Sequence, residues 1–303
     1  MTTKVVKGEK MKCLFEGAGV ALVTPFRNGK IDFSALENII ERDLTLGAKA
    51  IILLATTGEG VTVDDQERVK LIRFARKIIN NRLPLIVGCG HNNFEIARER
   101  VLQAKKLGAD GALVVTPYYN KTTQRGLIEY YLELDKLGLP IIMYSVPSRT
   151  GLIIELDSVK QIIAKSQNIY GIKESSTDII RIKSLCNLCN NKIAVYSGED
   201  ELNYIFYCLG AKGAVSVTAN IFPHRVQQVY DLVKHGKYRS ALKSQNLLFN
   251  IDRALFCETN PIPIKYFMSL FGLVDEEVRK PLISLSDKNK KLMKKVFKKY
   301  QSK

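Results

Sequence analysis

An apolar run that ends on a lysine, IYGIKES at residues 169–175, organises the rest of the sequence. The run is typical of a buried strand, and Lys173 stands at its end. Burying an unpaired ammonium group is costly, so a lysine at the edge of a core tends to lose its proton. A neutral amine attacks ketones and aldehydes, which makes Lys173 a candidate for Schiff-base formation. On these residues alone, the alternative is a strand-end lysine whose amine reaches out to water.

Short apolar segments alternate with helical patterns on both sides of this run. The predicted strands cover residues 17–26, 48–57, 84–88, 111–118, 140–146, 169–173, 193–197 and 213–218. The predicted helices cover residues 34–46, 65–79, 94–107, 124–137, 156–164, 179–188 and 202–209. At the start of the first helix, Ser34 and Glu37 have the spacing of a capping box.

The strands show no alternation of polar and apolar residues, so both of their faces are expected to be buried. This is the pattern of a parallel sheet covered by helices. Eight such units predict an α/β fold, a (β/α)8 TIM barrel. An open, doubly wound sheet is the alternative, but the sequence lacks the G-x-G-x-x-G turn of that fold.

The chain of 303 residues is expected to divide into three parts. A basic N-terminal extension covers residues 1–12, the barrel covers residues 13–224, and a C-terminal helical extension covers residues 225–303. No apolar run reaches the roughly 18 residues of a membrane span, and no signal peptide is evident. We therefore expect a cytoplasmic protein with no membrane partner. The six scattered cysteines fit that compartment, and the C-x-x-C formed by Cys186 and Cys189 is interpreted as structural.

Most of the formal net charge of +16 lies in the two tails. Residues 1–12 carry a net charge of +3 and residues 287–303 carry +7. A nucleic-acid-binding protein would spread its basic residues over a folded face, so we expect no nucleic-acid partner. The C-terminal tail has apolar residues at helical spacing, namely Leu292, Met293, Val296, Phe297 and Tyr300. This amphipathic pattern indicates a helix that docks on its own protein, with a membrane surface as the alternative.

Chemistry in such a barrel is found at the carboxyl ends of the strands. Thr56 and Thr57 follow the second strand and open a glycine turn, which can present hydroxyl and N–H groups to a carboxylate. Tyr144 and Arg149 follow the fifth strand, as a possible proton shuttle and carboxylate clamp. Lys173 ends the sixth strand. Any one of these is equally consistent with an ordinary strand end or turn, but together they predict a site for a keto acid.

Several motifs give the sequence a resemblance to one family. ATTGE, VTPYYN, YSVPSRTG, GIKES, SGED, GAVSVTAN and NPIP resemble the dihydrodipicolinate synthase family over residues 15–285. The resemblance implies that Lys173 forms an imine with pyruvate, whose enamine attacks the aldehyde of L-aspartate-4-semialdehyde. The product would be 4-hydroxy-tetrahydrodipicolinate, on the diaminopimelate route to lysine. It also implies a lyase that assembles as a homotetramer, a dimer of dimers.

The same resemblance implies roles for further residues. Tyr144 would relay protons to and from the imine, and Thr56 would link it to Tyr119 of a neighbouring subunit. Thr57 would hold the carboxylate of pyruvate, and Arg149 the carboxylate of the semialdehyde. The backbone carbonyl of Val215 would line the pyruvate pocket.

No metal and no cofactor are expected for this chemistry. The three histidines, His91, His224 and His235, form no metal-ligand pattern in the sequence.

The sequence departs from lysine-inhibited members of that family. Where they carry a glutamate on the third helix this chain has Ile96, and where they carry histidine or tryptophan it has Asp65 and Arg68. Tyr118 and Asn92 remain. The α-amine of lysine would lose its charge partner at position 96, so we predict that the enzyme is insensitive to lysine.

Two alternative functions stay open from the sequence. One is a related Schiff-base enzyme that acts on N-acetylneuraminate or on a 2-keto-3-deoxy sugar acid. Arg149 argues against the sialic-acid lyases, which lack this arginine. The other is a barrel that binds a keto acid without catalysis, against which the presence of both Lys173 and Tyr144 argues.

Overall fold

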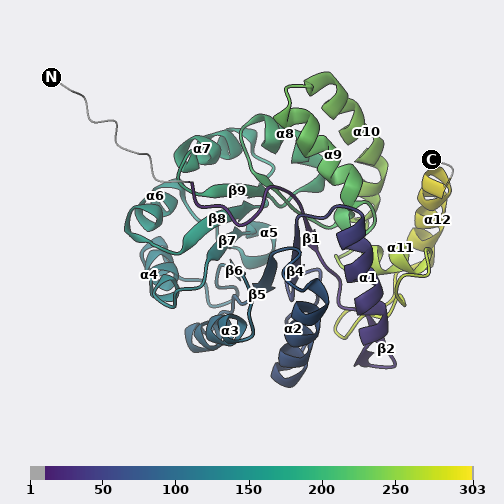
Figure 1. Cartoon of the computed structure of the whole chain (residues 1–303), viewed down its shortest axis with the longest axis horizontal. Helices are drawn as coiled ribbons and strands as arrows, with labels where there is room; N and C mark the ends of the chain where they lie inside the picture. The colour runs from purple at the N-terminus through teal and green to yellow at the C-terminus, as the bar shows by residue number, and fades with distance from the viewer. Residues whose placement is uncertain (1–10, 302–303) are drawn as a thin grey trace.

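A computed structural model describes residues 11–301, and within them eight parallel strands close into a barrel (Figure 1). Around the barrel the order of the strands is β1, β10, β9, β8, β7, β6, β5 and β4. The strands are β1 (Gly17–Ala21), β4 (Ala50–Leu53), β5 (Leu85–Gly88), β6 (Gly111–Val115), β7 (Ile141–Ser145), β8 (Ile169–Glu174), β9 (Ala194–Ser197) and β10 (Gly213–Ser216). The predicted TIM barrel is confirmed. The N-terminal extension expected over residues 1–12 falls outside the described residues, except for its last two.

Helices surround the barrel and bury the outer faces of its strands (Figure 1). They are α1 (Phe33–Thr45), α2 (Asp65–Ile79), α3 (Phe94–Lys106), α4 (Gln124–Asp135), α6 (Leu156–Lys165), α7 (Ile179–Cys189), α8 (Asn203–Cys208) and α9 (Pro223–Lys234). Because both faces of the sheet are covered, the strands are continuous apolar runs. The interior is filled by a second apolar cluster that includes Ile52, Ile86, Leu113 and Ile142.

The lower end of the barrel is closed by aromatic rings. Phe15, just before β1, stacks on Tyr196 of β9 with ring centroids 4.4 Å apart. The hydroxyl of Tyr196 donates a hydrogen bond to the carbonyl of Phe15 at 3.1 Å. Before them, Lys12 forms a parallel bridge with Ile193. The start of the described chain therefore lies across the ends of the strands opposite to the rim where catalysis is expected.

Local signals explain most of the helix boundaries, with one correction. At α2, Asp64 and Glu67 form a full capping box. The capping box predicted from Ser34 and Glu37 is wrong, because Asp32 caps α1 by accepting a hydrogen bond from the N–H of Ala35. The predicted strand over residues 17–26 also ends early, at Ala21. It is followed by a short hairpin of β2 (Phe26–Arg27) and β3 (Lys30–Ile31).

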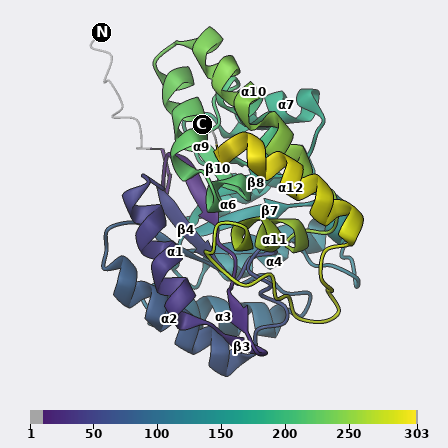
Figure 2. The ribbon, with the colours of Figure 1, turned by 90° about the vertical axis from the view of Figure 1, so that its right-hand side faces the viewer.

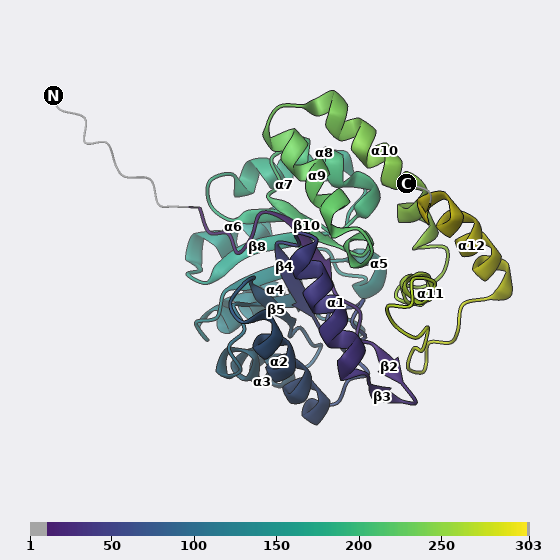
Figure 3. The ribbon, with the colours of Figure 1, turned by 45° about the vertical axis from the view of Figure 1, so that its right-hand side comes forward.

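The C-terminal segment forms the helices α10 (Tyr238–Ala254), α11 (Ile262–Ser269) and α12 (Asp287–Gln301). Figures 2 and 3 show α11 and α12 (yellow) on one side of the barrel, with the loop between them near the β2–β3 hairpin. Met293, Val296 and Tyr300 of α12 are buried, and the hydroxyl of Tyr300 donates to the carbonyl of Leu247 in α10. The predicted docking of this basic helix on its own protein is confirmed, although Leu292 is exposed.

No helix within residues 11–301 combines the length and the apolar character that a membrane crossing needs.

Candidate active site

Lys173 lies near the end of β8 and is 6% exposed. Strand register places it opposite Tyr144 of β7 on one side and Tyr196 of β9 on the other. Its Nζ lies 4.2 Å from the centroid of the Tyr144 ring. Among residues 11–301, its Nζ has no hydrogen bond or ion pair with another side chain. The amine is therefore buried with its bonding capacity unused.

A glycine makes room for this lysine. A Cβ placed on Gly198, at the end of β9, would lie 2.9 Å from the Cε of Lys173 and 2.1 Å from the Oγ of Ser175. Both approaches are closer than non-bonded atoms tolerate, so any larger residue at position 198 would displace the lysine chain.

Two carboxylates lie close to Lys173 in the fold. Glu174, the next residue, is fully buried and pairs with Arg181 at 2.7 Å. Burial raises the pKa of Glu174, and Arg181 opposes that rise. Glu199 follows β9, and burial, followed by repulsion from Asp200, raises its pKa to about 7, while the charge of Lys173 acts in the opposite direction. Carboxyl groups of both protonation states are thus available near the amine at neutral pH.

A cavity of about 290 Å³ opens at this rim of the barrel. Thr56, Tyr144 and Arg149 line it, as the sequence predicted for one shared site. Lys173, Thr57 and Val215 are not part of its lining. Thr57 and Val215 are buried, like Lys173.

Tyr119 does not take part in this cavity. Its side chain is 94% exposed and its backbone is left-handed, with φ +69°. The structure of a single chain therefore brings Tyr144, Thr56 and Arg149 together and leaves Tyr119 on the surface.

Asn260 is a site residue that the sequence reasoning missed. Its Nδ2 donates a hydrogen bond of 3.0 Å to the hydroxyl oxygen of Thr57, and its carbonyl accepts one of 3.2 Å from Arg149. It lies in the segment before α11, so the C-terminal extension contributes directly to the site. The quoted NPIP motif begins at this residue and was the available signal.

A buried ionic network holds the turn that carries Thr56 and Thr57. Glu59 of this turn pairs with the fully buried Lys265 of α11 at 2.5 Å. Burial lowers the pKa of Lys265 to about 8, and Glu59 opposes that shift. The hydroxyl of Thr24 donates to the carbonyl of Gly58 at 2.6 Å. The turn is therefore fixed both to the first strand and to the C-terminal extension.

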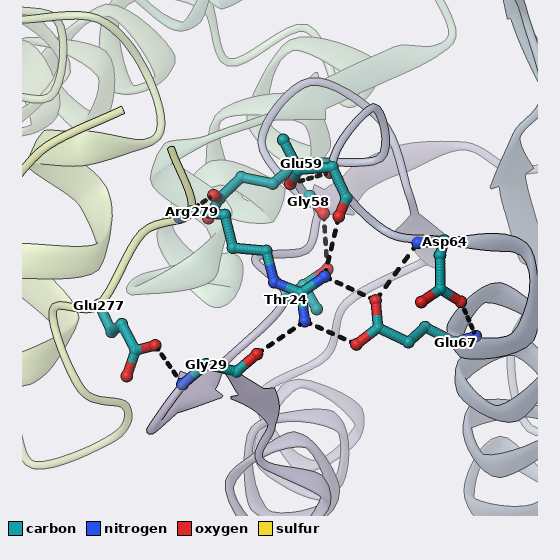
Figure 4. A network of polar contacts seen from close by, with 9 residues as sticks. Thr24, Gly29, Gly58, Glu59, Asp64, Glu67, Glu277 and Arg279 are labelled. Atoms are coloured by element: carbon teal, nitrogen blue, oxygen red, sulfur yellow. Dashed lines mark hydrogen bonds and ion pairs between the residues drawn. The ribbon is translucent and has the colours of Figure 1, made fainter. Parts of the chain in front are cut away.

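Arg279, in the segment between α11 and α12, extends this network (Figure 4). Its backbone N–H donates to the second oxygen of Glu59 at 2.9 Å. Its guanidinium group donates to both carboxylate oxygens of Glu67 at 2.6 Å and to the carbonyl of Gly29 at 3.0 Å. Such a two-pronged contact fixes direction as well as distance. The extension is thereby joined to α2 and to the β2–β3 hairpin.

Comparison with known proteins agrees with this geometry. The profile of the Dihydrodipicolinate synthetase family matches residues 14–300. The chain belongs to this family. The family prediction made from the sequence is thus confirmed, and so is the predicted enzyme class, a lyase of the 4-hydroxy-tetrahydrodipicolinate synthase type.

Similar relatives cover nearly the whole chain. A 4-hydroxy-tetrahydrodipicolinate synthase of Thermodesulfovibrio yellowstonii is 42% identical over 285 residues, which are 94% of this chain and 98% of that protein. The crystal structure of dihydrodipicolinate synthase from Aquifex aeolicus aligns with a TM-score of 0.93 at 39% identity, covering 95% of this chain and 98% of that one. The structure of a monomeric dihydrodipicolinate synthase variant aligns with a TM-score of 0.93 at 38% identity, covering 95% and 97%.

Within residues 11–301, no three or more His, Cys, Asp or Glu side chains are grouped as they would be around a metal ion.

Proposed function

We propose that this protein condenses pyruvate with L-aspartate-4-semialdehyde to give 4-hydroxy-tetrahydrodipicolinate, with Lys173 as the nucleophile. The observation that carries the proposal is the buried Lys173 amine, which has no hydrogen-bonding partner in the described chain and lies over the ring of Tyr144. An amine of this kind can attack a ketone, because no existing bond has to be broken first.

In the proposed reaction, the Lys173 amine adds to the keto carbon of pyruvate, and the keto oxygen leaves as water. Loss of a proton from the methyl group of the imine gives an enamine, whose carbon attacks the aldehyde of the second substrate. The aldehyde oxygen becomes the hydroxyl of the product. The amino group of the second substrate then attacks the imine carbon, closes the ring and releases Lys173.

Tyr144 is the proposed proton carrier for these steps. Each step moves a proton on or off the nitrogen or the departing oxygen, and the Tyr144 ring is the aromatic group next to Nζ. Thr56 lines the same cavity and is proposed to pass protons between Tyr144 and Tyr119 of a neighbouring subunit. The exposed position of Tyr119 is compatible with a contact across subunits.

The carboxylates of the two substrates are assigned to two places. The hydroxyl oxygen of Thr57 accepts a hydrogen bond from Asn260, so its own proton is free to be donated to the pyruvate carboxylate. The carbonyl of Val215 is proposed to line the same pocket. Arg149, on the cavity wall, is proposed to bind the carboxylate of the semialdehyde.

Borohydride reduction with pyruvate, followed by peptide mass mapping, tests the nucleophile. We expect a pyruvate adduct on the peptide that contains Lys173, and an adduct on any other lysine would contradict the proposal. A parallel assay with semialdehyde and with N-acetylneuraminate tests the substrate. Turnover of N-acetylneuraminate alone would assign the chain to a different Schiff-base enzyme.

We also propose that lysine does not inhibit the enzyme. On α3, Ile96 has no carboxylate to offer, and Arg100, one helical turn further on, lines the cavity together with Tyr118. A lysine ligand would bring a positive amine toward positive groups, which is unfavourable. Initial rates measured over a lysine titration at fixed pyruvate should stay constant, whereas strong inhibition at physiological lysine concentrations would overturn this proposal.

A homotetramer, built as a dimer of dimers, is the proposed assembly. Sedimentation velocity of the purified full chain tests it, and a monomer that remains fully active at all concentrations would contradict the role given to Tyr119.

A further inference from the structure

Arg68 of α2 is a fully buried cation without a counter-ion. Its Nη2 donates a hydrogen bond of 3.0 Å to the carbonyl of Gly88, while its Nε and Nη1 are buried without any hydrogen-bond partner. No carboxylate among residues 11–301 lies within ion-pair distance of it. A buried charge with unused donors is costly, and such donors are normally satisfied by a ligand, an ion or water.

A second arginine faces the same region from the neighbouring helix. Arg100 of α3 has a buried Nε without a partner, and it also forms no ion pair within the described part of the chain. It lines the cavity together with Gly88, whose carbonyl holds Arg68. We call the region around these two side chains the Arg68–Arg100 corner.

The groups between the two arginines do not neutralise them. Burial raises the pKa of Cys89 to about 11, so at neutral pH it is an uncharged thiol. The pKa of His91 is lowered by burial, then by Arg100 and, more weakly, by Arg68. Burial also lowers the pKa of Arg68, and Arg100 lowers it further, while the more distant Asp65 acts weakly in the opposite direction. The corner is therefore a positive region inside a partly enclosed cavity.

We propose that the Arg68–Arg100 corner is a binding site for a small oxyanion or carboxylate, separate from the place where Lys173 would bind the keto acid. Guanidinium groups suit this chemistry, because their planar N–H donors match the oxygens of carboxylate and phosphate. An anion here would neutralise the two charges and satisfy the unused donors. This inference does not depend on the proposed reaction, since it concerns only the charge and the donors of the cavity wall.

The cavity joins the corner to the candidate active site. Arg100 and Gly88 line the same 290 Å³ space as Tyr144 and Arg149. An anion bound at the corner would therefore lie near the substrates and change the potential that they experience. The corner would make the enzyme responsive to small anions.

Thermal unfolding of the full chain tests binding without using activity. Inorganic phosphate and acetate are titrated at constant ionic strength with chloride as the balancing anion, so that the arms separate oxyanion, carboxylate and halide. For the wild type we expect a saturable rise of the melting temperature with phosphate or acetate. Arg68→Met and Arg100→Met should each weaken the apparent affinity by about tenfold or more.

Three further variants make the test specific. Arg98→Met removes the same charge from the same helix, but Arg98 is exposed and contacts Glu95 at 3.7 Å, so the anion effect should be unchanged. Arg149→Met should also keep the effect, because it changes only the proposed substrate clamp. Arg100→Lys keeps the charge and should retain part of the affinity. Without anion, Arg68→Met should melt higher than the wild type, because an unpaired buried charge has been removed.

Three results would overturn the proposal: no saturable rise in the wild type, an equal loss in Arg98→Met, or a loss in Arg149→Met while the corner variants keep the effect. Should Arg68→Met fail to fold, Arg100→Met on the cavity wall decides the outcome by itself.

Discussion

The chain buries two lysines near one rim, and their surroundings differ in one respect. Lys265 is fully buried and its amine is saturated: it contacts Glu59 at 2.5 Å, the carbonyl of Glu277 at 2.8 Å and the Phe26 ring at 4.1 Å. Lys173 is almost as buried, but its amine has only the Tyr144 ring beside it. Burial by itself therefore does not make a lysine reactive. An amine that is engaged in an ion pair holds structure together, and an amine without partners is available for a substrate.

The perturbed pKa of Lys265 illustrates the same point. Burial lowers the pKa of Lys265 to about 8, a value that would suit a nucleophile. Yet its partners occupy the amine, and the ion pair with Glu59 holds the turn next to Thr56 and Thr57. Geometry has to be considered before acidity when a catalytic lysine is chosen.

The comparison would be broken most directly by Lys173→Ala. We expect turnover to fall by about 10⁴-fold, because removing a covalent nucleophile removes the reaction path. The variant should also lose the borohydride-trapped pyruvate adduct while keeping its melting temperature. Lys265→Met is the matched control, which should still be labelled on Lys173. Residual trapping in Lys173→Ala would refute the distinction.

Breaking the other lysine's ion pair should affect stability. Glu59→Gln leaves the buried Lys265 without its partner, and we expect the free energy of unfolding to fall by about 3–5 kcal/mol. Urea denaturation followed by circular dichroism measures this. The double variant Glu59→Gln with Lys265→Met should recover much of the loss, since no unpaired charge is then buried. Equal stability of the wild type and Glu59→Gln would show that the pair does not hold the turn.

Tyr144→Phe sharpens the role of the group beside Lys173. The ring stays in place and the hydroxyl is lost, so kcat should fall by about 10²-fold with little change in stability. Steady-state kinetics at saturating pyruvate gives the value. Tyr118→Phe, in the wall of the same cavity, is the control and should stay within a few-fold of the wild type. Loss of the same size in both variants would assign the effect to packing.

The smallest expected effect is a pH dependence of stability that belongs to Lys265. Burial lowers its pKa from 10.5 to about 8, so between these values the unfolded chain binds one more proton than the folded protein. The contribution of Lys265 to stability therefore rises with pH in that window, and it is constant below pH 8. Subtracting the unfolding free energies of Lys265→Met from those of the wild type should give a positive slope of about 1 kcal/mol per pH unit. A flat or falling difference would contradict the sign.

The barrel and much of its site could be predicted because parallel strands carry strong signals. Continuous apolar runs identified the strands, and the rule that strand ends share one rim brought Thr56, Tyr144, Arg149 and Lys173 into one region before any coordinates. The structure places all four at that rim, while the chemical role of each stays a prediction.

Features without periodicity or with distant partners escaped the sequence. The β2–β3 hairpin has two residues in each strand, too few to show alternation. Asp32 and Ser34 are both competent caps, and only the backbone chose Asp32. Asn260 reaches Thr57 across 203 residues of sequence, and no local pattern encodes such a contact.

The stacked rings of Phe15 and Tyr196 also determine the traffic through the barrel. With that end filled, reactants and product share one doorway at the opposite rim. The keto acid, which must reach Lys173, has to be seated before the aldehyde arrives, and a lingering product obstructs the next round. Binding order and product inhibition thus follow from how the far end of the barrel is plugged.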